Sequence, residues 1–377
     1  MLFLNDTYNK FVNRITGKKI ILFGASSLWN YYIRIFADID TQVLDHTLFI
    51  VDNDSAKQGI ISDIAGRKLK IESVEALFNQ QNYIILIVVS MAYQEEICKQ
   101  LASLDIPLNT ECYSLPLMIY HQRTADNSCV ESYFAEHISS NIPKIIHSFW
   151  FSGEEKPDIY KRCLESWHRH CPDYEIIEWN SNNYDIAKNQ YMKEAYERKK
   201  WAFVSDYARL DVIYEHGGIY LDMDVELLSS IDRLRNAKAF FCRQEDGFIE
   251  LGSGFGAPQR NEFIGEMLAE YTGKTFLDSE GAMDMTPQPQ RMAGVFERHG
   301  ISICHDSEII KDMIFLSNDY ITCGQTAEAL ESKDTRLGVH WHNAGWLSDE
   351  KRNVFKKSSE IMPVLQKKYF KETADFE

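Results

Sequence analysis

The sequence lacks several patterns that would assign a chain to a well-known class. Its eight cysteines are scattered and none forms a C-x-x-C pair, so neither a zinc knuckle nor a redox motif is visible. The amino terminus has neither the charged start nor the apolar core of a signal peptide. The most apolar run, residues 83–91, is far shorter than the roughly 20 residues needed to span a bilayer. We therefore expect free thiols and a soluble, cytoplasmic protein.

Positive charge is also scarce. Forty Lys and Arg against 56 Asp and Glu give a net charge of −16, which would repel a polyanion and argues against a nucleic-acid partner. A hydrophobic content of 45% is typical of a globular protein. Because 377 residues exceed one average domain, we expect two domains, each with its own core.

Strands and helices alternate over the first 120 residues. Apolar strands are predicted at 18–24, 47–54 and 82–90, and apolar residues at helical spacing follow the first and the third. Such alternation favours a parallel sheet with right-handed crossovers. The sequence therefore predicts an α/β fold that begins with a small Rossmann-like domain over residues 1–120.

The dinucleotide-binding fingerprint of such domains is incomplete. Gly24 is the one glycine present of the three in G-x-G-x-x-G, and Trp29 replaces the glycine that permits close helix packing. Asp52 ends the second strand, where it could bind a ribose hydroxyl or be an ordinary strand-end acid. The stretches GASS and VDNDSAKQG weakly resemble Rossmann-like domains attached to bacterial sugar-modifying enzymes. An NAD(P)-binding protein stays an alternative to a scaffold or regulatory role for this domain.

Residues 121–141 are polar and lose the apolar periodicity, so we predict a linker there, followed by a second domain over 142–350. In the remaining tail, 351–377, the segment 351–371 carries seven Lys and Arg against one Glu. This basic, amphipathic segment suggests a peripheral contact with the inner face of the cell membrane. The alternative is a terminal helix packed on the second domain, which Pro363 would keep short.

Two carboxylates one residue apart are the main chemical feature of the second domain. Residues 218–225 are predicted to form a strand, whose alternation sends Tyr220, Asp222 and Asp224 to one face. Two like charges this close favour a divalent cation, and Mn²⁺ or Mg²⁺ prefers such oxygen ligands together with waters or phosphates.

Two other acidic motifs match the pair less well. An EF-hand loop that starts at Asp222 needs glycine where Leu227 stands, and a phospho-aspartate phosphatase needs Thr or Val where Glu226 stands. Two acids at an exposed strand end, without any ligand, stay an open interpretation.

A helix is expected directly before this strand. Its apolar stripe consists of Phe203, Tyr207, Leu210 and Tyr214. Gly217 suits the left-handed position that ends a helix. Asp206 and Arg209 are three residues apart and emerge on one flank, where by themselves they would be an ordinary surface salt bridge.

Together these motifs resemble the D-x-D glycosyltransferases of family 32. This group includes yeast-type initiating mannosyltransferases and many bacterial capsule and exopolysaccharide enzymes, and it is distantly similar to the glucosylating domains of clostridial toxins. The resemblance covers residues 142–235 well and 236–350 loosely. It is carried by IPKIIHSFWFSG (142–153), WHRHCPDYEIIEWN (167–180), AFVSDYARLDVIYEHGGIYLDMDVELL (202–228) and VHWHNAGW (339–346). It implies a GT-A fold, an αβα sandwich that binds a nucleotide sugar.

The resemblance also implies roles for single residues. Trp150 matches the position whose ring stacks on the nucleotide base. Asp206 and Arg209 match the pair that contacts the donor sugar. Asp222 and Asp224 match the metal-binding acids, with Asp222 also directed toward the ribose. Arg209 and the two acids are expected to act on the departing diphosphate.

The carboxy-terminal motif departs from the family pattern. His340 matches its first histidine, a metal ligand or phosphate contact, and Trp346 matches its closing, donor-binding tryptophan. His342 competes with His340 for the ligand role, and Gly345 stands where the family has serine. Tyr220 joins the donor-binding residues because it shares the face of the acids.

Three further residues have weaker expectations. Ser253 and Gly254 are predicted in a tight strand-to-loop segment beside the acceptor. His147 is expected to be a hydrogen-bonded structural histidine.

The resemblance implies a metal-dependent, retaining hexosyltransferase that moves a sugar from a UDP- or GDP-sugar to a saccharide acceptor. The expected setting is bacterial surface polysaccharide synthesis, where the acceptor can be lipid-linked. No nucleophilic carboxylate is identifiable, so same-face attack by the acceptor hydroxyl is expected. The alternative is a non-catalytic nucleotide-sugar-binding module, because the carboxy-terminal motif departs from the family pattern.

Overall fold

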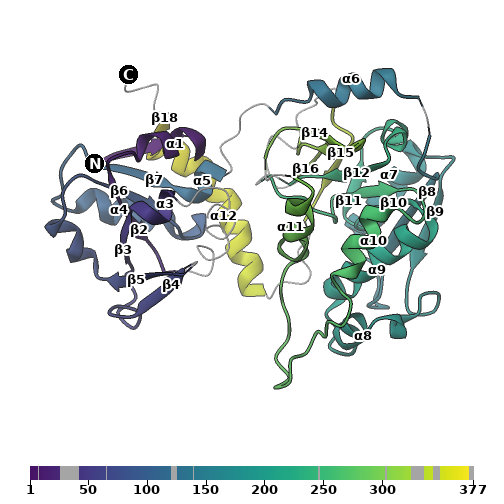
Figure 1. The fold of residues 1–377 in the computed structure, drawn as a ribbon, viewed down its shortest axis with the longest axis horizontal. Coiled ribbons are helices and arrows are strands. Elements are labelled where there is room, and N and C mark those ends of the chain that lie inside the picture. The colour runs from purple at the N-terminus through teal and green to yellow at the C-terminus, as the bar shows by residue number, and fades with distance from the viewer. Residues whose placement is uncertain are drawn as a thin grey trace. The chain divides into compact units, whose positions relative to one another are not determined.

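The computed structural model describes the chain except for residues 7, 26–41, 65, 120–124, 139, 245–246, 302–303, 324–334, 343–348 and 373–377. Contacts within the chain divide it into two compact units (Figure 1). The first unit comprises residues 1–123 and 347–377, and the second comprises residues 124–346. Within the described residues, no helix is both long and apolar enough to cross a membrane.

The first unit is built on an eight-stranded sheet in the order β18-β1-β7-β6-β2-β3-β5-β4. Its strands are β1 (Leu2–Asn5), β2 (Lys19–Phe23), β3 (Thr47–Val51), β4 (Ile61–Ile64), β5 (Arg67–Glu72), β6 (Tyr83–Ile87), β7 (Glu111–Ser114) and β18 (Lys371–Glu372). All neighbours pair in parallel except the antiparallel edge pair β4–β5. The strands predicted at 18–24, 47–54 and 82–90 are thereby confirmed as β2, β3 and β6.

Short helices accompany this sheet. They are α1 (Tyr8–Arg14), α3 (Gln42–His46), α4 (Gln94–Ser103), α5 (Leu115–Ile119) and the 3-10 turns η1 (Val74–Asn79) and η2 (Met91–Tyr93). The apolar side chains of β2 and β6 are buried on both faces of the sheet, in two separate clusters. This two-sided burial explains why these strands are continuous apolar runs in the sequence. Most of the helix expected after β2 lies outside the described residues.

The end of the chain returns to the first unit. Helix α12 (Asp349–Lys368) packs against η2, and the hydroxyls of Ser90 and Ser358 are 2.9 Å apart. Leu365 and Phe370 are buried in the core of the first unit. The expectation that the tail packs on the second domain is therefore wrong, and the predicted interruption at Pro363 is wrong too. Apolar packing of the last turns supports the helix beyond the proline.

The second unit contains a seven-stranded mixed sheet and a small three-stranded sheet. The large sheet has the order β14-β15-β12-β13-β10-β8-β9, and the small sheet the order β11-β17-β16. The strands are β8 (Ile145–Phe149), β9 (Glu175–Trp179), β10 (Gly218–Tyr220), β11 (Val225–Leu227), β12 (Ala239–Cys242), β13 (Phe255–Ala257), β14 (Glu308–Ile310), β15 (Met313–Leu316), β16 (Ile321–Cys323) and β17 (Gly338–His340).

Helices cover both faces of the large sheet. They are α6 (Ser128–Glu136), α7 (Asp158–His170), α8 (Gln190–Glu197), α9 (Trp201–His216), α10 (Glu262–Ala269), α11 (Gln288–Arg298) and the 3-10 turns η3 (Ile186–Lys188) and η4 (Asp232–Asn236). Side chains of α8 to α11 form one core with one face of the sheet. Side chains of α6 and α7 pack in a second core that contains the opposite face. The predicted α/β sandwich is therefore confirmed.

The predicted strand over 218–225 is wrong in one respect. Strand β10 ends at Tyr220, and a turn at residues 223–224 leads into β11, which belongs to the small sheet. The turn is closed by the amide of Val225, which donates to the carbonyl of Asp222 at 3.0 Å. Ile219, Leu221 and Met223 still share one buried cluster, so the predicted apolar face survives the break.

The described part of the predicted linker, 121–141, contains helix α6 in the second unit. Val130 is its fully buried apolar residue, which explains why the apolar periodicity was too weak to predict a helix. Polar contacts also hold it. Glu131 pairs with Arg233 at 3.2 Å, and Asn127 accepts a hydrogen bond from the Ser307 hydroxyl.

Candidate functional site

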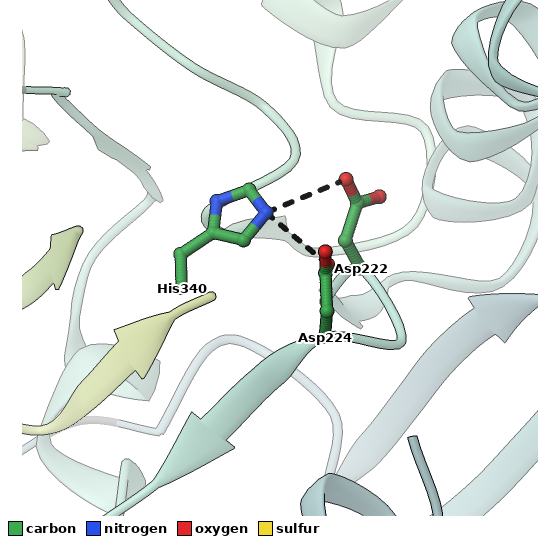
Figure 2. A group of neighbouring side chains, drawn as sticks. All are labelled: Asp222, Asp224 and His340. Atoms are coloured by element: carbon green, nitrogen blue, oxygen red, sulfur yellow. Dashed lines mark ion pairs between the residues drawn. The ribbon is translucent and has the colours of Figure 1, made fainter. Parts of the chain in front are cut away.

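Two carboxylates and an imidazole meet in the second unit (Figure 2). The Nε2 atom of His340 lies 3.2 Å from Oδ1 of Asp224 and 3.9 Å from Oδ2 of Asp222. One ligand atom from each residue lies within 4.8 Å of the others. Strands β11 and β17 create this contact, because their register places Val225 opposite His340. The turn that breaks the predicted strand thus brings both acids to the histidine.

This cluster fits a divalent cation. Asp224 and His340 are buried, whereas the Asp222 side chain is 30% exposed and opens the cluster to solvent. Two carboxylate oxygens and one imidazole nitrogen are ligands that Mn²⁺ accepts, and remaining positions suit waters or phosphate oxygens. The predicted ligands Asp222, Asp224 and His340 are therefore together in space.

The charge balance of the cluster raises the pKa of His340. Burial acts to lower that pKa, but the carboxylates of Asp224, Asp222 and Glu250 together outweigh it. The acids therefore favour a positive charge at this place. A proton on Nε2 of His340 and a metal ion at the same atom exclude each other, because the ligand nitrogen needs a free lone pair.

Arg209 and Asp206 lie on one flank of α9, as predicted, but not as a surface salt bridge. The Arg209 side chain is 5% exposed and that of Asp206 is 9% exposed, with 3.0 Å between their nearest charged atoms. The guanidinium also lies 3.7 Å from Oδ1 of Asp222. Burial raises the pKa of Asp206 to about 7; Arg209 opposes that rise, and Glu250 and Asp222 add to it. This buried pair is thus linked directly to the D-x-D acids.

Tyr220 holds Asp222 in place. Its hydroxyl donates a 2.5 Å hydrogen bond to Oδ1 of Asp222, and the Arg209 guanidinium lies over its ring at 4.9 Å. The ring is buried. The Tyr220 hydroxyl therefore directly contacts one of the two acids, Asp222.

Trp150 follows β8 at the same sheet end as Asp222. Its ring is half-buried, its Nε1 donates to the carbonyl of Glu154 at 2.7 Å, and its edge meets Tyr160. The pairing of β8 with β10, extended by the Ser148 hydroxyl that donates to the carbonyl of Leu221, fixes this location. A partly exposed indole there is placed suitably for stacking on a base.

His147 lies in the interior of the same strand. Its Nε2 is 2.9 Å from the carbonyl of Gly217, and its Nδ1 accepts from the indole of Trp179 at 3.0 Å. Burial lowers its pKa to about 4. It is the hydrogen-bonded structural histidine that the sequence suggested.

The loop between β12 and β13 adds residues that the sequence did not assign to the metal site. Ser253 places its hydroxyl 2.9 Å from Nδ1 of His340, and Glu250 accepts from the amide of Gly252 at 3.0 Å. A Cβ on Gly252 would lie 2.5 Å from Oδ2 of Asp222, so a larger residue there would displace the carboxylate. The spacing of glycines in ELGSGFG was the available signal, although it could not reveal the partner.

The two carboxy-terminal histidines differ in role. The rings of His340 and His342 stack with centroids 3.8 Å apart. Burial, helped by His340, lowers the pKa of His342 to about 3, so its ring is neutral. The ring that faces the acids is that of His340. Trp346 and Gly345 lie outside the described residues.

Asp52 of the first unit has a different environment. Its carboxylate accepts from the amides of Ala25 at 2.6 Å and Asp54 at 2.8 Å, and Lys57 lies 3.4 Å away. A Cβ on Gly24 would overlap a methyl group of Val89. These contacts explain both the glycine and the acid without a ligand.

Comparison with known proteins agrees with the site. Residues 157–241 match the family described as "Glycosyltransferase sugar-binding region containing DXD motif". The match includes Asp206, Arg209, Asp222 and Asp224. The segment that holds these four residues therefore resembles a glycosyltransferase family, as the sequence predicted.

Two curated relatives come from Schizosaccharomyces pombe. Inositol phosphoceramide mannosyltransferase 3 is 30% identical over 144 residues, which cover 34% of this chain and 38% of that protein. Inositol phosphoceramide mannosyltransferase 1 is 24% identical over 134 residues, which cover 33% of this chain and 40% of that protein. The chain thus spans about two fifths of the length of these relatives.

Two solved structures are also similar. PaToxG glycosyltransferase gives a TM-score of 0.33 at 13% identity, covering 45% of this chain and 74% of that one. A glycosyltransferase involved in the glycosylation of the major capsid of PBCV-1 gives a TM-score of 0.32 at 14% identity, covering 58% of this chain and 98% of that one.

Proposed function

We propose that the chain is a metal-dependent, retaining hexosyltransferase that moves a sugar from a nucleotide sugar to a saccharide acceptor. The observation that carries this proposal is the convergence of Asp222 and Asp224 with His340, a residue more than a hundred positions away, at one point. The family match of the segment that holds both acids supports it.

Mn²⁺ or Mg²⁺, held by Asp222, Asp224 and His340, would supply Lewis-acid stabilisation of the departing diphosphate. The Arg209 guanidinium, 3.7 Å from Asp222, is placed to donate to a phosphate or sugar oxygen beside that acid. Asp206 fixes the guanidinium from its other side at 3.0 Å. Both groups are held before substrate binds, so little reorganisation is needed during the reaction.

The donor contacts follow from the same sheet end. Trp150 would stack on the base, and Asp206 and Arg209 would contact the sugar. From the family resemblance alone, Trp346 would belong to the donor site as well. Same-face attack by the acceptor hydroxyl would retain the configuration. The donor would be a UDP- or GDP-sugar, and the curated relatives, named mannosyltransferases, support a hexose.

The acceptor would be a saccharide in bacterial surface polysaccharide synthesis, as the family resemblance implies, and the basic tail suggests that this saccharide is lipid-linked. The relatives are named for the lipid inositol phosphoceramide, which supports an acceptor attached to lipid. A cytoplasmic location at the inner face of the membrane belongs to this proposal. The apolar residues Leu365 and Phe370 of the basic tail are buried within the first unit, so such a contact would depend on its Lys and Arg.

A thermal-shift panel of UDP- and GDP-sugars, each with and without Mn²⁺, tests the proposal. We expect one donor to raise the unfolding temperature only with Mn²⁺, because the metal joins the diphosphate to the acids. The same donor should then release nucleoside diphosphate. Stabilisation without any turnover, with or without acceptor, would indicate the non-catalytic binding module instead. No stabilisation by any donor would contradict the proposal.

A matched acid provides the control. Asp224→Ala should abolish the Mn²⁺-dependent shift, whereas Asp52→Ala should retain it, because Asp52 is occupied by contacts of the first unit.

A further inference from the structure

Ser253 is in direct contact with the imidazole of His340. Its hydroxyl oxygen lies 2.9 Å from Nδ1, while Nε2 on the other side of the ring faces Asp224 at 3.2 Å. Ser253 is 2% exposed and His340 is 4% exposed. The hydrogen bond is therefore shielded from water, and its loss would leave a buried ring nitrogen without this partner.

The chemistry of the imidazole gives this contact a function. A neutral ring carries one proton, and the nitrogen that binds a metal must be the one without it. When Nε2 binds a metal ion the proton is on Nδ1, and the Ser253 hydroxyl can accept from it. The His342 ring, stacked at 3.8 Å, restrains the plane of the imidazole. The hydrogen bond between Ser253 and Nδ1 restrains the rotation of the ring, and with it the direction of Nε2 toward the acids.

The turn that carries Ser253 also holds the D-x-D acids. The amide of Asp222 donates to the carbonyl of Gly252 at 3.1 Å, and the amide of Ser253 donates to the carbonyl of Glu250 at 3.2 Å. One short turn therefore contacts Asp222 through its backbone and His340 through a side chain. The turn thereby connects Asp222 and His340, which come from distant parts of the sequence.

We propose that Ser253 is a positioning residue of the metal site, which holds the His340 ring through Nδ1 so that Nε2 is directed at the acids as a ligand. This inference rests on the proposed function. It gives Ser253 a place beside the metal, where the sequence had suggested the acceptor.

The test is titration of the full chain with MnCl₂, with free Mn²⁺ measured by electron paramagnetic resonance. Removal of a residue that orients a metal-bound histidine typically weakens metal binding about 10- to 100-fold. Ser253→Ala should therefore weaken Mn²⁺ binding by at least about 10-fold. Ser253→Thr, which keeps the hydroxyl, should restore most of the affinity.

Ser317→Ala is the matched control. Ser317 is fully buried in the same unit, and its hydroxyl donates to Asn127 at 2.8 Å, so the variant also loses a buried hydrogen bond. It should lower the unfolding temperature by an amount similar to that of Ser253→Ala and leave Mn²⁺ binding unchanged. Equal weakening in both variants would mean a general loss of stability and would overturn the positioning role.

Two further outcomes separate this inference from the proposed function. Parent-like Mn²⁺ binding by Ser253→Ala, together with lost binding by Asp224→Ala, would overturn the role of Ser253 and leave the metal site standing. Failure of the parent chain to bind Mn²⁺ would overturn both.

Discussion

Asp52 and Asp222 have similar positions in the two units but different surroundings. Each follows the carboxyl end of a parallel strand, β3 in the first unit and β10 in the second. The carboxylate of Asp52 accepts from two backbone amides and has Lys57 beside it. Asp222 has a second acid and His340 as neighbours, and its nearest cation, Arg209, is shared with Asp206.

This difference separates a structural acid from one that is available to a ligand. The charge of Asp52 is used to close a turn of its own unit. In the second unit, the carboxylates around His340 carry more negative charge than Arg209 balances. This excess raises the pKa of His340, although burial acts to lower it. Position at a strand end is therefore a weak predictor of function, and the local charge balance is a strong one.

The largest effect is expected from Asp224→Ala. Loss of a metal ligand should reduce Mn²⁺-stimulated donor turnover at least about 100-fold, the scale on which electrostatic stabilisation of a leaving group acts. The unfolding temperature should stay close to that of the parent, because the variant relieves repulsion from Asp222. Asp222→Asn should behave in the same way. Transfer at the parent rate by either variant would show that the acids do not bind the metal.

Arg209→Lys should have the next largest effect. Lysine keeps the charge but loses the planar fork that reaches both Asp206 and Asp222, and it loses the packing over Tyr220. We expect kcat/KM to fall about 10- to 100-fold, mostly in kcat, because the guanidinium is preorganised for the transition state. Steady-state kinetics with saturating Mn²⁺ provide the measurement. An unchanged kcat would limit Arg209 to a structural role.

His147 provides a test that is independent of the metal site. Its pKa falls from an ordinary value of 6.5 to about 4 in the folded chain, so between these values the unfolded chain binds more protons. Its stabilising contribution is present above pH 6.5 and is lost as the pH falls toward 4. By this linkage the loss between pH 7 and pH 5 is about 2 kcal/mol.

Asp206 changes the free energy of unfolding in the opposite direction. Its pKa is raised to about 7, so the folded chain binds the extra proton and becomes more stable as the pH falls from 7 to 5. Asp206 is present in both the parent and His147→Gln, so its contribution cancels when the two proteins are compared. Chemical denaturation at pH 7 and pH 5 should show a smaller loss of unfolding free energy in the variant. Identical losses would contradict the buried, neutral state of His147.

The smallest effect is expected from Asp52→Asn. The variant weakens the hydrogen bonds from Ala25 and Asp54 and should cost about 1 kcal/mol of unfolding free energy. Mn²⁺-stimulated turnover should not change. Calorimetry with NAD(P) should show no binding that depends on this residue. A loss of turnover equal to that of Asp222→Asn would remove the distinction between the two acids.

Much of the fold could be predicted from sequence because its signals were local. The apolar runs of β2 and β6 are buried on both faces, so each is visible without knowledge of its neighbours. Helix α6 was missed because Val130 is its one fully buried apolar residue, which leaves no helical periodicity in the sequence. The strand break after Tyr220 was missed because the apolar alternation continues through the turn.

The site residues could be predicted where they lie close together in one short segment or belong to a family motif. Asp206, Arg209, Asp222 and Asp224 fall within about twenty residues, and His340 belongs to a motif. Ser253 and Glu250 could not be assigned, because their meaning depends on contacts across the sequence. Ser253 touches a residue 87 positions away, and no periodicity indicates that pairing.

The central claim is that Asp222, Asp224 and His340 together bind one divalent cation. Crystals grown with Mn²⁺ and measured near the manganese absorption edge test this claim most directly. We predict one strong anomalous peak in contact with both carboxylates and with Nε2 of His340. A peak elsewhere in the chain, or none at this cluster when Mn²⁺ is saturating, would contradict it.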